Sequence, residues 1–184
     1  MDQVSGIGFC KRHPAILLCL VLPALLLLAA ADEPLEYQVK AAFLLNFTKF
    51  IGWPAEAFAA ADSPFAICIL GDDPFGGALN AILAGETVAG RKVTVEKIKR
   101  APAPKSCQML FISSSEKEVR KIFPALGPGV LTVGEGETFT RDGGMIAFVI
   151  ENRRVRFGVN QPAAENAGFK LSSKLLNVAR FVEK

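Results

Sequence analysis

The histidine content of this chain limits its chemistry. His13 is the one histidine in the sequence, and it lies beside Lys11 and Arg12, ahead of an apolar run over residues 15–28. A basic stretch, an apolar stretch and small residues at 29–31 are typical of a cleaved secretory signal. A mature chain without histidine cannot build a Ser-His-Asp or Cys-His nucleophile or a histidine-ligated metal site. We therefore expect no enzyme and no cofactor.

Four acidic residues form the best remaining catalytic candidates. Asp72 and Asp73 follow one apolar run, and Glu135 and Glu137 follow another predicted strand. The carboxyl ends of parallel strands meet at one edge of a sheet, so these side chains could form a weak divalent-cation site or an acid–base pair. The alternative is solvated loop acids, with Asp72 or Asp73 capping the next helix.

Three consecutive serines stand between a predicted strand and a predicted helix. A nucleophilic serine needs a base, and here Lys117 or Lys121 would have to serve. We expect Ser113, Ser114 and Ser115 to cap the helix instead.

Three arginines, Arg153, Arg154 and Arg156, lie in a predicted hairpin near the C-terminus. Arg154 and Arg156 alternate with Val155 and Phe157, so they share one face of the strand. Two guanidinium groups could hold a carboxylate, a phosphate or the acids of a partner, with Asn160 close by in sequence. An exposed polar face without function is the alternative.

An aromatic block lies near the start of the mature chain. Phe43, Phe47 and Phe50 recur at helical spacing, and Trp53 follows them. Such a face usually packs on the core. Any aromatic side chain left outside would suit a protein partner or a small aromatic ligand.

Two cysteines stay in the mature chain. Cys68 and Cys107 are 39 residues apart, and each lies in or at the start of a predicted buried strand. An exported protein meets an oxidising compartment, which favours a disulfide between them. Two buried thiols that never meet are the alternative.

The domain organisation follows from the export signal. Residues 1–31 read as the signal and residues 32–184 as a single domain located in the periplasm, with an uncleaved membrane anchor as the alternative. The 21 basic and 18 acidic residues of the chain nearly balance, so we expect no nucleic-acid binding.

Apolar runs and turn signals outline an α/β fold. Strands alternate with helices through the middle of the chain, which indicates βαβ units and a mostly parallel sheet, with an antiparallel hairpin over 145–160. The helices are expected at 35–51, 74–85, 116–125 and 171–183, and the strands at 65–70, 91–98, 107–113, 130–133, 145–150 and 155–160.

Several motifs resemble those of one family of exported bacterial proteins, the YfiR family. The resemblance covers residues 36–182. Its motifs are FTKFIGWP at 47–54, ILGDDPFG at 69–76, VAGRKV at 88–93, CQMLFIS at 107–113, LTV at 131–133, GGMI at 143–146, VRF at 155–157 with Asn160, and LSSKLL at 171–176.

The resemblance implies a three-layer, Rossmann-like α/β domain that tends to dimerise and responds to redox conditions through cysteines. Cys68 and Cys107 look like the more N-terminal cysteine pair of the family. It further implies a periplasmic regulator that binds and inhibits the periplasmic domain of a membrane-bound diguanylate cyclase, which lowers cyclic-di-GMP and restrains biofilm growth. A periplasmic small-molecule sensor acting on another receptor is the alternative, since small aromatic ligands are associated with the family.

Overall fold

The structure is a computed structural model that describes residues 32–101 and 106–184, with side chains from residue 35 onward. By its internal contacts the chain divides into Met1–Glu33 and Pro34–Lys184, and the architecture below is that of the second unit. The export signal expected at residues 1–31 lies outside the described residues.

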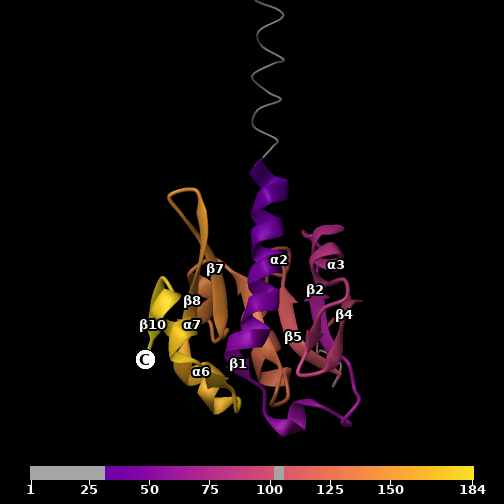
Figure 1. Cartoon of the computed structure of the whole chain (residues 1–184). Coiled ribbons are helices and arrows are strands. Elements are labelled where there is room, and N and C mark those ends of the chain that lie inside the picture. Colours follow the sequence, from indigo (N-terminus) through magenta and orange to yellow (C-terminus); the bar gives the residue numbers. More distant parts are fainter. Residues whose placement is uncertain (1–31, 102–105) are drawn as a thin grey trace, which may run out of the picture. The chain divides into compact units, whose positions relative to one another are not determined.

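A mixed sheet forms the centre of this unit (Figure 1). The described residues build eight strands in the order β10-β8-β7-β6-β5-β2-β4-β3, parallel except at the β7–β8 hairpin and at the β3–β4 edge. The strands are β2 (Phe65–Leu70), β3 (Thr87–Val88), β4 (Arg91–Ile98), β5 (Cys107–Ile112), β6 (Leu131–Glu135), β7 (Ile146–Glu151), β8 (Arg154–Asn160) and β10 (Phe181–Glu183).

Helices cover both faces of the sheet, which confirms the expected three-layer α/β fold. The long helix α2 (Asp32–Phe50) crosses one face, together with α3 (Ala78–Leu83), α6 (Gln161–Asn166) and α7 (Ser173–Val178). The opposite face carries α4 (Val119–Ile122), the 3-10 turn η2 (Phe123–Ala125) and α5 (Thr138–Arg141). Both faces of β2 and β5 are buried, because each is a continuous apolar run.

A second, two-stranded sheet joins the end of α2 to the C-terminal region. In it β1 (Ile51–Gly52) pairs with β9 (Lys170–Leu171), and the 3-10 turn η1 (Ala55–Ala57) follows β1 in the chain. The amide of Ser172 also donates a hydrogen bond to the Phe50 carbonyl over 3.0 Å. This connection places the C-terminal end of α2 next to α7.

Two helix predictions were wrong in extent. The segment expected as one helix over 171–183 forms α7 and then β10, which adds a parallel strand beside β8. Residues 116–125 form α4 and a 3-10 turn. The expected serine cap is also wrong, because the N-cap of α4 is Glu118, which makes no side-chain cap hydrogen bond. The expected aspartate cap is wrong as well, because the N-cap of α3 is Gly77 and not Asp72 or Asp73.

Candidate functional site

The aromatic residues of α2 build one wall of a surface cavity. Phe47 is buried and stacks on Phe148 with ring centroids 5.8 Å apart, and its edge meets Phe157 at 5.1 Å. Phe43 packs on the same two rings. Phe50, one turn further along α2, is 39% exposed. The predicted aromatic face is therefore mostly core, and its last ring lies outside.

Helix α7 forms the other wall of this cavity. The cavity measures about 280 Å³ and lies between α2, β8 and α7. Val178 on α7 is 59% exposed at its mouth, beside Phe50. Asn46 and Lys174 add an amide and an ammonium group to the otherwise apolar lining. We call the exposed side chains of Phe50 and Val178, with the cavity between them, the Phe50–Val178 surface.

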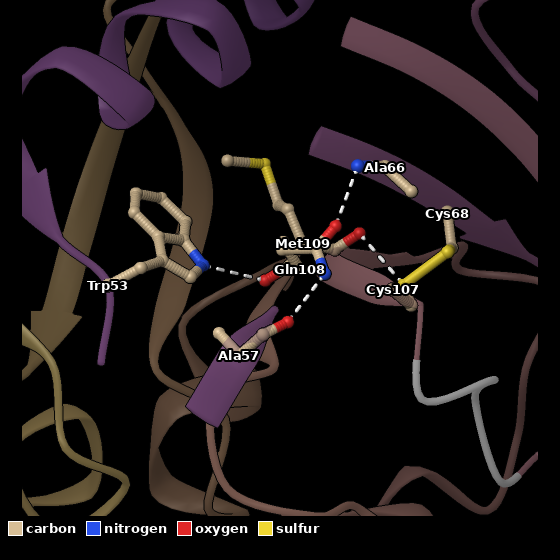
Figure 2. Close-up of a disulfide and its surroundings, with 7 residues drawn as sticks. All are labelled: Trp53, Ala57, Ala66, Cys68, Cys107, Gln108 and Met109. Atoms are coloured by element: carbon tan, nitrogen blue, oxygen red, sulfur yellow. Dashed lines mark hydrogen bonds between the residues drawn. A yellow bond between two sulfur atoms is a disulfide. The ribbon is translucent and has the colours of Figure 1, made fainter. Parts of the chain in front are cut away.

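Trp53 lies in the core, away from this cavity. Its ring meets Phe65 edge-on at 4.8 Å and Phe169 at 5.6 Å, and its Nε1 donates a hydrogen bond to the Gln108 carbonyl over 3.0 Å (Figure 2). The half-buried indole thus fixes the chain where it leaves α2.

The structure contains the expected disulfide. Cys68 on β2 and Cys107 on β5 are bonded, with Cα atoms 6.0 Å apart, and both side chains are buried (Figure 2). The β2–β5 register shifts between Ala66 and Ile67. Gln108 lies at this irregularity, and its side chain accepts a hydrogen bond from the Ala66 amide over 2.7 Å.

Gln108 is a residue that the sequence reasoning missed. It is 1% exposed, and its Nε2 also donates to the Ala57 carbonyl over 2.7 Å. A polar side chain inside the apolar run 107–112 was the available signal, because a buried amide needs hydrogen-bond partners.

The hairpin arginines lie away from the Phe50–Val178 surface. Arg154 and Arg156 are exposed on one face of β8, and Phe157 points to the opposite face, into the core. Both polar atoms of the Asn160 side chain are used within the fold: its Oδ1 accepts a hydrogen bond from the Ala163 amide at the start of α6, and its Nδ2 donates one to the Thr140 carbonyl. The structure does not bring these three residues together with the aromatic candidates.

The acidic candidates are held by different partners. Glu135 pairs with Lys40 at 2.5 Å, Asp73 pairs with Lys97 at 2.7 Å, and Glu137 pairs with Arg141 at 3.2 Å. Within the described part of the chain, no group of three or more His, Cys, Asp or Glu side chains could hold a metal ion.

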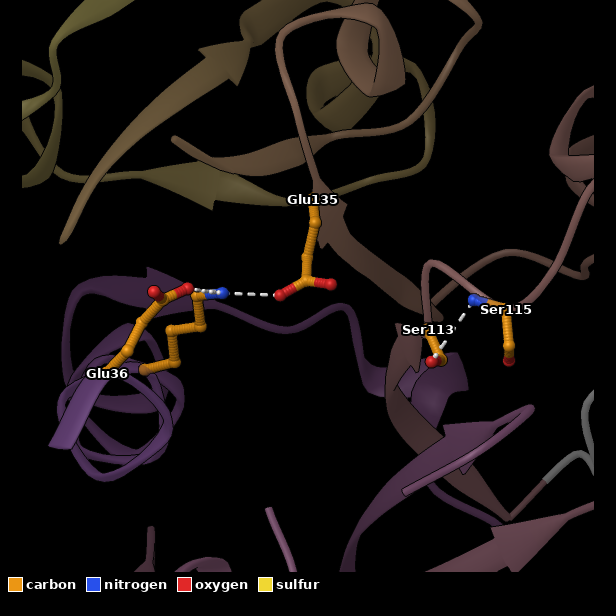
Figure 3. A network of polar contacts seen from close by, with 5 residues as sticks. Glu36, Ser113, Ser115 and Glu135 are labelled. Carbon is orange, nitrogen blue, oxygen red and sulfur yellow. Dashed lines mark hydrogen bonds and ion pairs between the residues drawn. The ribbon is translucent and has the colours of Figure 1, made fainter. Parts of the chain in front are cut away.

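Lys40 is a second buried polar residue that was not predicted from the sequence. It lies 4% exposed and pairs with the carboxylates of Glu36 and Glu135, which face each other in Figure 3. Its ammonium is 4.3 Å from the centre of the Tyr37 ring. Burial lowers the pKa of Lys40, but its hydrogen bonds to Glu135 and Glu36 outweigh burial and hold the pKa above its ordinary value. Burial and the Glu135 carboxylate raise the pKa of Tyr37.

The serines connect two loops at the carboxyl edge of the sheet. The Ser115 hydroxyl accepts a hydrogen bond from the Asp72 amide over 3.0 Å, and the buried Ser113 hydroxyl lies 3.4 Å from the Ser115 amide (Figure 3). Among the described residues, no base is hydrogen-bonded to either hydroxyl, so Ser113 and Ser115 hold the two loops together and are not arranged as a nucleophile.

Comparison with known proteins gives a family match. A model of the YfiR/HmsC-like family matches residues 37–180. A search of curated proteins found no match. No helix among the described residues is long and apolar enough to cross a membrane.

Two solved structures share part of the fold at low identity. One is a conserved domain protein from Vibrio cholerae O1 biovar eltor strain N16961, with 9% identity and a TM-score of 0.45, covering 64% of this chain and 54% of that one. The other is an ABC domain in complex with L-Trp from Streptococcus pneumonia, with 11% identity and a TM-score of 0.41, covering 65% and 55%. The chain thus aligns with about half the length of each.

Proposed function

Because the chain belongs to the YfiR/HmsC-like family, we propose that it is a periplasmic, non-enzymatic regulator that binds and inhibits a membrane-anchored signalling protein. The most direct target is a diguanylate cyclase, whose inhibition would lower cyclic-di-GMP. The observation that carries this proposal is the Phe50–Val178 surface, an apolar patch that has no covering element among the described residues.

The surface has the properties of a binding hot spot. Phe50 follows a packed stack of aromatic rings on a long helix, and Val178 ends a helix that is fixed to α2 through the Ser172–Phe50 hydrogen bond. Apolar side chains held on rigid elements lose little conformational entropy when a partner covers them. The ammonium groups of Lys49 and Lys174 lie on the same two helices and could form a charged rim.

The test is binding of the mature protein to the isolated periplasmic domain of its receptor. Phe50→Glu and Val178→Glu should each weaken binding by about thirtyfold, because truncating a buried anchor costs about 2 kcal/mol. Leu35→Glu and Val39→Glu are matched controls, since these residues are exposed by 59% and 37%, against 59% for Val178 and 39% for Phe50. The controls should bind like the wild type.

A further variant separates binding from catalysis. Glu137 is exposed and pairs with Arg141 at the surface, so Glu137→Gln should leave both the fold and the inhibition unchanged. The proposal fails if Glu137→Gln abolishes inhibition of the receptor while the Phe50 and Val178 variants retain it.

A small-molecule sensor is the second candidate, and the same cavity favours it. Four phenyl rings with the Asn46 amide and the Lys174 ammonium group at the wall suit a planar aromatic carboxylate. Calorimetry with indole-3-acetate tests this, and Lys174→Gln should then weaken binding of the acid without changing the binding of the receptor domain.

A further inference from the structure

The β7–β8 hairpin ends in a turn with an unusual residue. Glu151 and Arg154 lie opposite each other in the strand register, and the two residues between them, Asn152 and Arg153, have φ angles of 49° and 60°. Two-residue turns with positive φ at both positions favour Asn-Gly, because glycine adopts this conformation without strain. An arginine in the second position therefore has an unfavourable backbone conformation.

The turn is followed by two further arginines on one face. Arg154 and Arg156 are exposed, and among the described residues neither guanidinium has a carboxylate partner. Glu151, the acidic residue of the turn, is already paired with Arg180. The face of β8 that Arg154 and Arg156 share therefore carries two guanidinium groups without a carboxylate partner among the described residues.

Apolar side chains are exposed at the same end of the unit. Ile150, on the opposite face of the hairpin from Arg154, is 53% exposed. A cavity of about 410 Å³ is lined by Glu36, Tyr37 and Lys40 of α2, by residues 135–137 at the end of β6 and by Phe148 to Ile150 of β7, so the first turns of α2 lie beside this end of the hairpin. Leu35 and Val39, exposed on those turns, extend the apolar area.

We propose that this hairpin tip docks on an anionic phospholipid surface. Guanidinium groups pair with lipid phosphates, and exposed aliphatic side chains at the same end of the hairpin can enter the interfacial region. The hairpin extends past its neighbouring strands (Figure 1), so it presents a narrow projection, which suits a soft, flat surface better than the broad contact of a protein interface.

The proposal goes beyond the proposed function, because it concerns a second surface. Leu35 and Phe50 are fifteen residues apart on α2, which corresponds to about 22 Å along a helix. A protein bound to the membrane by the hairpin would still expose the Phe50–Val178 surface.

The experiment is co-sedimentation of the mature protein with vesicles. We expect binding to phosphatidylcholine vesicles that contain phosphatidylglycerol, no binding to pure phosphatidylcholine, and loss of binding at high salt. The Arg154→Gln/Arg156→Gln variant should bind about thirtyfold more weakly. Lys92→Gln/Arg100→Gln removes the same charge near the opposite edge of the sheet and should bind like the wild type.

Arg153→Gly gives an independent readout. Glycine relieves the positive φ, so the midpoint of thermal unfolding should rise, while vesicle binding should fall by about fivefold. The proposal is overturned if the wild type ignores phosphatidylglycerol, or if the hairpin and control variants bind the vesicles equally. It is also overturned if the hairpin variant loses the isolated receptor domain instead, since the arginines would then face an acidic protein.

Discussion

Lys40 connects the first helix to the sheet through charge. Its ammonium group is buried between Glu36 on α2 and Glu135 at the end of β6, over the ring of Tyr37. Helical spacing places this residue off the centre of the aromatic face, and the sequence gives no sign that a carboxylate 95 residues later reaches it. Contacts of this range depend on how the sheet places β6, so they could not be predicted from local pattern.

Removing this charge should destabilise the fold in a pH-dependent way. Lys40→Met leaves the Glu135 carboxylate without its partner and should lower the free energy of unfolding by about 3 kcal/mol near neutral pH. The pKa values of Lys40 and Tyr37 are raised in the folded protein, so the stability linked to them is present below about pH 10 and is lost as the pH rises through the folded values.

Urea unfolding at several pH values checks this prediction. The wild type should lose stability above about pH 10, and Lys40→Met should lose less of it over the same range. Lys49→Met is the matched control, because Lys49 is half-exposed on the same helix and 3.9 Å from Glu86. Parallel curves for the wild type and Lys40→Met would contradict the role of the pair.

At the scale of elements, helix α5 packs on the sheet through the ring of Phe139, in addition to the hydrogen bonds that Thr140 makes with Asn160 and Glu183. Phe139 is buried, and its ring lies against Gly134 of β6 and Gly144, where added Cβ atoms would be 2.2 and 2.1 Å from it. Phe123 closes the site with its ring centroid 5.5 Å away. A four-residue helix has little stability of its own, so this packing determines its position.

A side chain added at Gly134 should therefore weaken the packing of α5 on the sheet. Gly134→Ala places a methyl group where the Phe139 ring lies, and overpacking of this kind costs about 1–3 kcal/mol. Hydrogen exchange should rise in residues 138–141. Gly77→Ala, where nothing lies within 4 Å of the added Cβ, should leave stability almost unchanged. Equal stability of the two variants would show that the ring has room to move.

The elements that the sequence predicted well are those with local signals. The apolar runs at 65–70 and 107–112 are β2 and β5, as their continuous burial requires. Residues 181–183 were misread because Val178, Ala179 and Val182 also fit a helical period. Ala179 leaves the helix with ψ 145°, and β10 depends on pairing with β8 and on Phe181 lying over Gly158, contacts that no local window contains.

At the scale of the whole unit, the candidate residues separate into two surfaces. Phe50 lies at one end of α2, beside α7, and the arginines lie at the other end, on the hairpin. Residue type alone predicted which side chains could bind a partner. It did not predict that Phe43, Phe47 and Trp53 would be taken up by packing, because exposure depends on which elements cover each ring.

Two separate surfaces predict a distinctive result with the receptor in a membrane. Contact of the hairpin with anionic lipid would raise the local concentration of the protein near the receptor without any new contact between the two proteins. Arg154→Gln/Arg156→Gln should therefore weaken binding to the full-length receptor by about tenfold or more in vesicles that contain phosphatidylglycerol, and not at all in pure phosphatidylcholine. Phe50→Glu should weaken binding equally in both, and the two effects should multiply in the combined variant, since distant sites act independently. Surface plasmon resonance with the two vesicle types measures this binding. An arginine effect of the same size in pure phosphatidylcholine would mean that the hairpin contacts the receptor itself, and the two-surface arrangement would be wrong.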